Sequence, residues 1–395
     1  MKRAFWLPLG VTALVLGLTT PASAATNDWR ADLSAVDGDD SNVTARDGQV
    51  RLDGTPARLG TRRAGFLVLA PHRLAQPANT ISATPTGSVP AGAEAAVDVR
   101  GDLGGDQWTE WVEARPDAPA VLPSEVRTVQ VRLVLTAPDG AAGPSVRALA
   151  LRASSTPSTR HDVGTTAAGL SYRVYATREG LVGGTTANGH VITSRDHFVA
   201  LPSRRGLAAK GSGAYSVRVC AANGRCEWAP VWDVGPWNTK DDYWNPSATR
   251  EMWKDLPQGK PEAQAAYENG YNGGKDQFGR AVANPAGVDL ADGTFWDGLK
   301  LTTNSWVTVT YQWTGSGPAG IVHTAGDALN VRAGATSTAA QVGLAANLAQ
   351  VRVECQLTGQ SVSGSQGTSS TWFRIASGKY VAKAYVSGVS GATTC

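Results

Sequence analysis

The chain lacks a long apolar run after its first two dozen residues, and only 17% of its residues are charged. Residues 1–24 themselves predict an export signal, because Lys2 and Arg3 precede a short apolar stretch that ends in the small residues of Ala-Ser-Ala. The apolar stretch is too short for a convincing membrane span. We therefore expect a mature chain that begins near Ala25, is secreted and has no membrane anchor.

The sequence also has little excess of positive or negative charge. The formal net charge is +3, and two of these excess positive charges belong to Lys2 and Arg3 in the expected signal. The pairs Arg62-Arg63 and Arg204-Arg205 are isolated, as solvated surface residues usually are. This near-neutrality argues against nucleic acid as a partner.

Several catalytic motifs are missing. The sequence contains no Gly-x-Ser-x-Gly elbow, no phosphate-binding loop and no dinucleotide fingerprint. Its five histidines are scattered, and no close cluster of Cys and His residues offers the spacing of metal ligands. We therefore expect neither a metal nor a cofactor.

The four cysteines are an even number in a chain expected to be exported, which favours disulfides. Cys220 and Cys226 flank Asn223-Gly224, a strong hairpin-turn signal, so a bridge across that hairpin is one expectation. Cys355 and Cys395 would then form the second bridge. Spacing alone leaves all three connectivities open.

With 45 glycines, 21 prolines and many short alternating segments, the sequence predicts a mainly β protein. Residues 28–155 predict a β-sandwich of jelly-roll type, either a carbohydrate-binding module or a spacer. A Ser/Thr-rich linker at 155–169 leads to a second domain at 167–314, and a Gly/Pro linker leads to a third at 321–395.

The last of these blocks resembles bacterial SH3-like domains. It contains Leu-Asn-Val-Arg-Ala-Gly at 329–334, Trp372, Gly-Lys-Tyr-Val at 378–381 and Tyr385-Val386. The resemblance implies binding of cell-wall peptides, with Trp372 and Tyr385 as binding residues. The alternative is that these aromatic side chains fill the core of a small barrel.

The middle block predicts strands with two short helices, one beginning at Pro261 and one following Asp289. Its motifs are Thr-Ala-Asn-Gly (186–189), His-Phe-Val-Ala-Leu-Pro (197–202), Asp-Val-Gly-Pro (233–236) and Val-Asp-Leu (288–290). In this order they resemble the double-psi β-barrel of the rare lipoprotein A group and, more distantly, expansins and family 45 endoglucanases.

The resemblance implies a glycan groove lined by His197, Asp233 and Asp289. Three departures stand out. Val234 replaces the arginine of the family motif, the spacing from His197 to Leu201 is one residue longer than in the family, and the stretch 238–285 is longer than usual.

The residues themselves also point to acid chemistry. Asp233 lies between Trp232 and Trp237, and apolar neighbours raise a carboxyl pKa, which suits a general acid that protonates a glycosidic oxygen. The bland alternative is a turn residue before Gly-Pro. Asp289 is either a second carboxyl or a helix N-cap, and His197 either assists Asp233 or ends a strand.

A hydrolase that inverts configuration needs two carboxyls, about 6.5–9.5 Å apart. A lytic transglycosylase needs one, because a hydroxyl of the substrate replaces water. Aromatic rings stack on sugars, so Trp237, Tyr243 and Trp244 are the expected substrate-binding residues beside the acid.

Together these features predict a secreted, monomeric, cell-wall-associated protein of three mainly β domains that acts on peptidoglycan or another cell-wall polysaccharide. Two alternatives remain at this stage. One is a non-catalytic, expansin-like or wall-binding protein, and the other is a structural surface protein.

Overall fold

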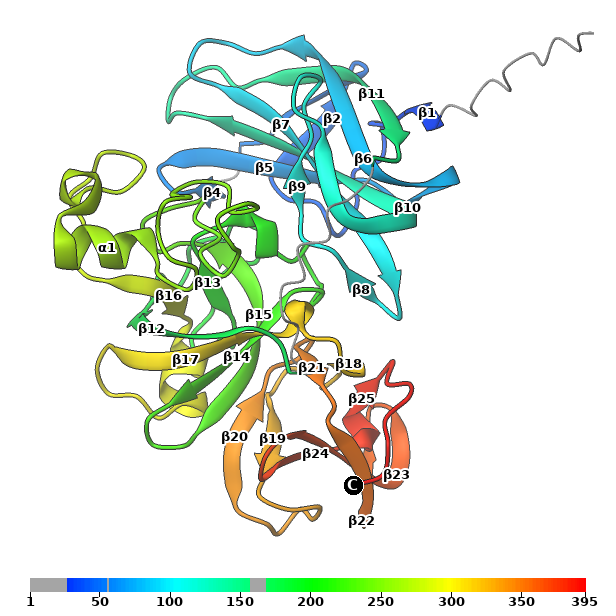
Figure 1. Cartoon of the computed structure of the whole chain (residues 1–395), viewed down its shortest axis with the longest axis vertical. Coiled ribbons are helices and arrows are strands. Elements are labelled where there is room, and N and C mark those ends of the chain that lie inside the picture. Colours follow the sequence, from blue (N-terminus) through cyan, green and yellow to red (C-terminus); the bar gives the residue numbers. More distant parts are fainter. Residues whose placement is uncertain (1–26, 55–56, 157–167) are drawn as a thin grey trace, which may run out of the picture.

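The computed structural model describes residues 27–54, 57–156 and 168–395. The export signal expected at 1–24 and most of the linker expected at 155–169 lie outside these residues. The described chain is mainly β, as predicted, with short helices between strands (Figure 1). None of its helices has the length and apolar character that a membrane crossing requires.

The first part of the chain forms one curled sheet, called here the N-terminal sheet, at the top of Figure 1. Its central order is β2-β3-β11-β6-β10-β5-β4, with four further strands paired at its sides. The strands are β1 (Asn27–Arg30), β2 (Val43–Arg46), β3 (Gln49–Leu52), β4 (Arg58–Leu59), β5 (Arg62–Val68), β6 (His72–Ser88), β7 (Glu94–Gly104), β8 (Gln107–Trp108), β9 (Val112–Glu113), β10 (Ala120–Ala137) and β11 (Ser145–Ser154).

Strand β10 explains how this sheet meets the rest of the molecule. Side chains alternate between the two faces of a strand, and here both faces are buried. Val131 and Leu133 pack into the core of the N-terminal sheet. Arg132 and Val134 point the other way, to the middle part of the chain.

The middle part is a closed barrel of six strands, as expected for this region. The order is β13-β16-β12-β17-β14-β15, and β15 closes the barrel by pairing with β13. The pairs β12–β16 and β13–β15 are parallel and the other four are antiparallel. The strands are β12 (Ser171–Arg178), β13 (Val199–Leu201), β14 (Ser216–Ala221), β15 (Cys226–Val234), β16 (Ala286–Leu290) and β17 (Ser305–Tyr311).

Short helices surround the barrel: η1 (Arg204–Gly206), α1 (Glu262–Asn269), η2 (Tyr271–Gly274), η3 (Thr294–Gly298) and η4 (Gln312–Thr314). The helix expected from Pro261 is α1, which ends at Gly270 in the left-handed conformation that glycine favours. The helix expected after Asp289 is present as η3, a single π-helical turn. Asp289 belongs to β16 and is therefore not a helix N-cap.

The last part, orange to red in Figure 1, adds a half-barrel and a small three-stranded sheet. The strands β20-β19-β24-β23-β22 extend the barrel sheet, because β20 pairs in parallel with β15. Both expected disulfides, Cys220–Cys226 and Cys355–Cys395, are present. The elements are β18 (Ala319–Val322), β19 (Leu329–Arg332), β20 (Gln341–Ala345), β21 (Gln350–Arg352), β22 (Cys355–Gly364), β23 (Gly367–Ala376), β24 (Lys379–Ala382), η5 (Lys383–Tyr385) and β25 (Val386–Ser387).

A buried charge network fixes the N-terminal sheet to the barrel. The carboxylate of Asp98 on β7 accepts hydrogen bonds from Arg132 at 2.7 Å and from Arg204 of η1 at 3.1 Å. All three side chains are at most 3% exposed. Burial alone would raise the pKa of Asp98, but the two guanidinium charges outweigh it and lower that pKa to about 2.

Candidate functional site

Three carboxyl groups gather where the strands β12, β16, β13 and β15 run side by side. In the strand register, Ala200 of β13 is paired with Asp233 on one side and with Asp289 on the other. Asp289 is in turn paired with Thr177 of β12, and Glu179 follows Thr177 by two residues. Residues in register share a face of a sheet, so the barrel brings Glu179, Asp233 and Asp289 together.

Glu179 and Asp233 form a pair of interacting carboxyl groups. Both carboxyl oxygens of Glu179 are buried, and neither has a hydrogen-bond partner among the described residues. The negative charge of Asp233 acts on this unsolvated carboxyl. Two neighbouring carboxyl groups repel each other when both are ionised, which favours a protonated form. The pair therefore titrates as a unit.

The surroundings act differently on the two carboxyl groups. Burial, and next the negative charge of Asp233, raise the pKa of Glu179 well above its ordinary value. Burial also raises the pKa of Asp233, but Glu179 and two backbone groups oppose that shift. The N–H groups of Ala187 and Val234 both donate to Oδ1 of Asp233 at 2.8 Å. Burial thus favours the protonated form of both carboxyl groups, and two backbone donors oppose this effect at Asp233.

Asp289 completes this group of three, called the carboxyl cluster below. Its Oδ1 accepts a hydrogen bond from the hydroxyl of Thr177. Burial raises the pKa of Asp289 from 3.8 to about 7, against the effect of that hydroxyl. Gly235 leaves room beside it, since a Cβ atom at that position would lie 3.5 Å from Oδ2 of Asp289.

The two residues whose N–H groups donate to Asp233 pack against the N-terminal sheet. Ala187 and Val234, whose N–H groups hold that carboxylate, pack their side chains against Phe66 and Val134 of the N-terminal sheet. Val234 is only 7% exposed there. An arginine at this position would place its charge in an apolar junction, which explains the departure from the family motif.

His197 does not join the carboxyl cluster. Its Nδ1 lies 2.9 Å from Oε1 of Glu227, which is fully buried and also accepts from the hydroxyl of Thr294. Burial alone would lower the pKa of His197, but the charge of Glu227 and their hydrogen bond outweigh it and raise that pKa. Among the hydrogen bonds of the described residues, none links His197 to Asp233 or Asp289.

Three of the five aromatic residues expected to bind substrate are buried, which argues against that role. Tyr243 and Trp244 are 0% exposed in the barrel core, with the Tyr243 hydroxyl donating to Gly287 and the Trp244 indole donating to Glu110. Trp372 is 3% exposed and donates to a backbone carbonyl. Side chains that fill a core offer no face to a ligand. The interpretation as core aromatics fits these three residues.

The other two expected aromatics remain partly exposed. Trp237 follows the Asp233 motif, has a positive φ of 61°, and donates from its indole to Asn284 at 3.1 Å. Tyr385 is half-buried and donates from its hydroxyl to Ser363. Both rings retain surface that a ligand could contact.

Sequence reasoning missed Glu179. It belongs to no motif, and its nearest sequence signal is the alternation of β12, which puts Thr177 and Glu179 on one face. The partners that define its role lie 54 and 110 positions further along the chain, at Asp233 and Asp289. Only the closure of the barrel brings them to Glu179.

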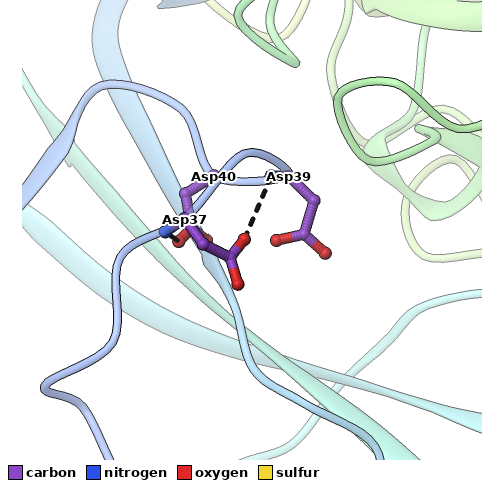
Figure 2. Close-up of side chains that lie close together, drawn as sticks. All are labelled: Asp37, Asp39 and Asp40. Atoms are coloured by element: carbon purple, nitrogen blue, oxygen red, sulfur yellow. Dashed lines mark hydrogen bonds between the residues drawn. The ribbon is translucent and has the colours of Figure 1, made fainter.

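A second acidic group lies in the N-terminal sheet. Figure 2 shows Asp37, Asp39 and Asp40 on one loop, with ligand atoms within 4.8 Å of one another, a spacing that could hold a metal ion. Asp40 is already bonded to the backbone of Asp37 and Val68, at 2.7 and 2.6 Å. Burial and the neighbouring carboxylates raise the pKa of Asp39 to about 7. No His or Cys pattern in the sequence singles out this loop.

The comparison with protein families covers the barrel. Residues 170–310 match the family model described as a domain of unknown function, DUF8814. This range begins just before β12, ends within β17 and includes the whole carboxyl cluster. No curated protein matches the chain.

Proposed function

We propose that this chain is a secreted protein that cleaves cell-wall glycan, with peptidoglycan as its substrate, in the manner of a lytic transglycosylase. The observation that carries the proposal is the pair of interacting carboxyl groups, Glu179 and Asp233, whose burial raises both pKa values. A buried carboxyl pair that retains a proton near neutral pH is what protonation of a glycosidic oxygen requires.

The architecture supports the same assignment. The closed barrel of six strands, with two parallel and four antiparallel pairs, is compatible with the double-psi barrel that the sequence motifs resemble. The half-barrel after it is compatible with a wall-binding SH3-like domain. Two disulfides suit an oxidising, extracellular location. Resemblance to both families implies the bacterial cell wall.

The geometry of the carboxyl cluster favours transglycosylation over hydrolysis. Retaining and inverting hydrolases separate their two carboxyls by about 5–5.5 Å and 6.5–9.5 Å respectively. Glu179 and Asp233 act on each other as one pair, so Asp289 is the group left to serve as the second carboxyl of a hydrolase. Asp289 could oppose them, but with a pKa of about 7 it is largely protonated in mild acid and is a poor base or nucleophile there.

One carboxyl pair is sufficient for the lytic reaction. The pair gives its proton to the glycosidic oxygen as the bond from that oxygen to the anomeric carbon breaks. A hydroxyl of the same sugar then bonds to the anomeric carbon, and its proton returns to the pair. Asp233 is the member that meets the substrate, because both carboxyl oxygens of Glu179 are covered.

Substitution of either carboxyl tests this mechanism. Glu179→Gln keeps a hydrogen-bond donor to Asp233 but removes the stored proton, and Asp233→Asn removes the group that delivers it. We expect each variant to release anhydro-sugar fragments from sacculi about 10²–10⁴ times more slowly than the wild type. The exposed Glu268→Gln is the matched control.

Mass analysis of the products separates the outcomes of this experiment. Anhydro-sugar ends from the wild type support the proposal, whereas reducing ends would make the protein a hydrolase. Wild-type rates in both carboxyl variants would refute the assignment of the pair.

The second candidate is a non-catalytic, expansin-like glycan binder. Two observations favour it: both carboxyl oxygens of Glu179 are covered, and Val234 replaces the family arginine. This candidate predicts that the protein pellets with sacculi and releases no soluble fragment.

A further inference from the structure

A stack of two arginines and a tryptophan borders the carboxyl cluster. The guanidinium carbons of Arg178 and Arg195 lie 4.8 and 4.7 Å from the ring centroid of Trp296, within cation–π range. Trp296 belongs to the π-helical turn η3, and Arg178 is the last residue of β12. We call these three residues the arginine stack.

The arginine stack is continuous with the carboxyl cluster. Arg178 is the chain neighbour of Glu179, and its Nη1 lies 2.8 Å from Oδ1 of Asp292. The charge of Asp292 is one of those that raise the pKa of Glu179. The guanidinium also folds over Gly180, where a Cβ atom would lie 3.6 Å from Nη1. Asp292 therefore links the stack to the carboxyl cluster, because it pairs with Arg178 and its charge acts on Glu179.

An open hollow lies at the far end of the stack. It has a volume of about 480 Å³ and is lined by Arg195, Trp296, Asp297, Lys300, Leu301 and Thr302. Pockets of about 300–1,000 Å³ suit small ligands, a sugar unit included. The hollow thus has the size of a subsite for one part of a chain.

The charges in the hollow favour an anion. Arg195 and Lys300 share a single carboxylate, since Nη1 of Arg195 lies 3.3 Å and Nζ of Lys300 lies 4.0 Å from Oδ1 of Asp297. Their side chains are 55% and 56% exposed, so both cations remain accessible to a ligand. Leu301 and the indole of Trp296 add apolar surface for a sugar ring.

We propose that this hollow is a subsite for a carboxylate-bearing unit of a glycan, so that the barrel selects anionic glycan, such as peptidoglycan with its peptide carboxylates, over neutral glycan. This inference rests on the proposed function and adds the chemistry of the substrate. Arg195 and Lys300 bind the carboxylate, while Trp296 and Leu301 pack on the ring. A neutral polysaccharide lacks the group that the two cations bind.

Binding to sacculi with and without carboxylates tests the subsite. The probes are native sacculi and sacculi whose carboxyls have been converted to neutral methylamides. The Asp233→Asn background is used, so that cleavage does not alter the probe. Arg195→Gln combined with Lys300→Gln is compared with Arg147→Gln combined with Lys254→Gln, which removes the same charge from exposed sites elsewhere.

We expect the Arg195/Lys300 double variant to bind native sacculi about tenfold more weakly than the control, because it loses two charge-assisted contacts. On amidated sacculi, both double variants should bind equally weakly. Equal affinity of the two double variants for native sacculi would overturn the subsite.

Product analysis of the wild type keeps the two proposals apart. If the wild type cleaves native and amidated sacculi at the same rate, the subsite proposal is refuted and the catalytic proposal stands. Binding that depends on carboxylates without any released fragment keeps the subsite and removes catalysis. A wild type that binds neither probe refutes both.

Discussion

At the scale of single residues, the three acidic side chains of the carboxyl cluster differ in the hydrogen-bond donors around them. The amino-acid composition alone does not show this difference. Two backbone N–H groups stabilise the ionised form of Asp233, whereas neither carboxyl oxygen of Glu179 has a hydrogen-bond partner among the described residues. Asp289 has one hydroxyl donor and a pKa of about 7. Three acidic side chains on one face of a barrel thus hold their protons over different ranges of pH.

The raised pKa of Asp289 predicts a pH-dependent cost of folding. Between pH 3.8 and about 7 the folded chain keeps a proton there that the unfolded chain releases. The stabilisation from this proton is complete below pH 3.8 and is lost as the pH rises to about 7. At about 1.4 kcal/mol per pH unit, the upper limit is roughly 4 kcal/mol, and the partial exposure of the residue reduces it.

Asp289→Asn keeps an acceptor for Thr177 and is neutral at every pH. We therefore expect this variant to unfold at a higher temperature than the wild type at pH 8, by a margin that shrinks towards pH 4. Thermal unfolding at both pH values measures the margin, with the exposed Asp117→Asn as control. A margin that is independent of pH would contradict the prediction.

At the scale of secondary-structure elements, the parallel pair β15–β20 joins the barrel to the half-barrel. Cys226, Glu227 and Trp228 are in register with residues 343–345. The two backbones approach so closely at Gly343 that a Cβ atom there would lie 2.0 Å from the carbonyl oxygen of Cys226. This junction therefore requires glycine.

Gly343→Ala should weaken the junction. Relief of the clash requires a backbone shift, which costs about 1–3 kcal/mol and exposes the segment between the barrel and the half-barrel. We expect a lower unfolding temperature and faster proteolysis within residues 315–320. Gly334→Ala is the control, because its Cβ atom would meet only Ala339, at 3.7 Å. Equal proteolysis of the two variants would contradict the role of this contact.

Local patterns in the sequence predicted the elements better than the site. The alternation around Val217 and Val307, the helix after Pro261 and the Asn223-Gly224 hairpin all depend on neighbouring residues, and each is present. The Glu179–Asp233 contact depends on strand pairing across the barrel, which a single sequence does not reveal. The sequence pattern also does not distinguish an aromatic ring that faces a groove from one that is buried. Trp244, in the segment after β15, is buried in the core.

At the scale of the whole molecule, the N-terminal sheet and the barrel depend on one buried carboxylate. Removal of the Asp98 charge leaves Arg132 as a buried cation without an ion-pair partner, and leaves Arg204 paired with Glu113 alone. Breaking a buried pair in this way costs about 3–5 kcal/mol. We therefore expect Asp98→Asn to lower the free energy of unfolding by several kcal/mol in a denaturant titration.

Asp139→Asn is the control for this prediction. The Asp139–Arg58 pair has the same 2.7 Å separation as Asp98–Arg132, but its side chains are 56% and 46% exposed. Exposed pairs contribute about 0–1 kcal/mol, so this control should change stability little. Similar losses of stability in both variants would mean that burial does not increase the contribution of the Asp98 network.

The continuous ladder from β15 to β20 also has a mechanical consequence. Because one hydrogen-bonded sheet runs from the barrel into the half-barrel, the two parts cannot rotate freely relative to each other. If the half-barrel holds a wall polymer as proposed, the carboxyl cluster reaches only strands at one set distance and orientation from that anchor. The distance between successive cleavage sites on the glycan would then be set by the distance between the half-barrel and the carboxyl cluster.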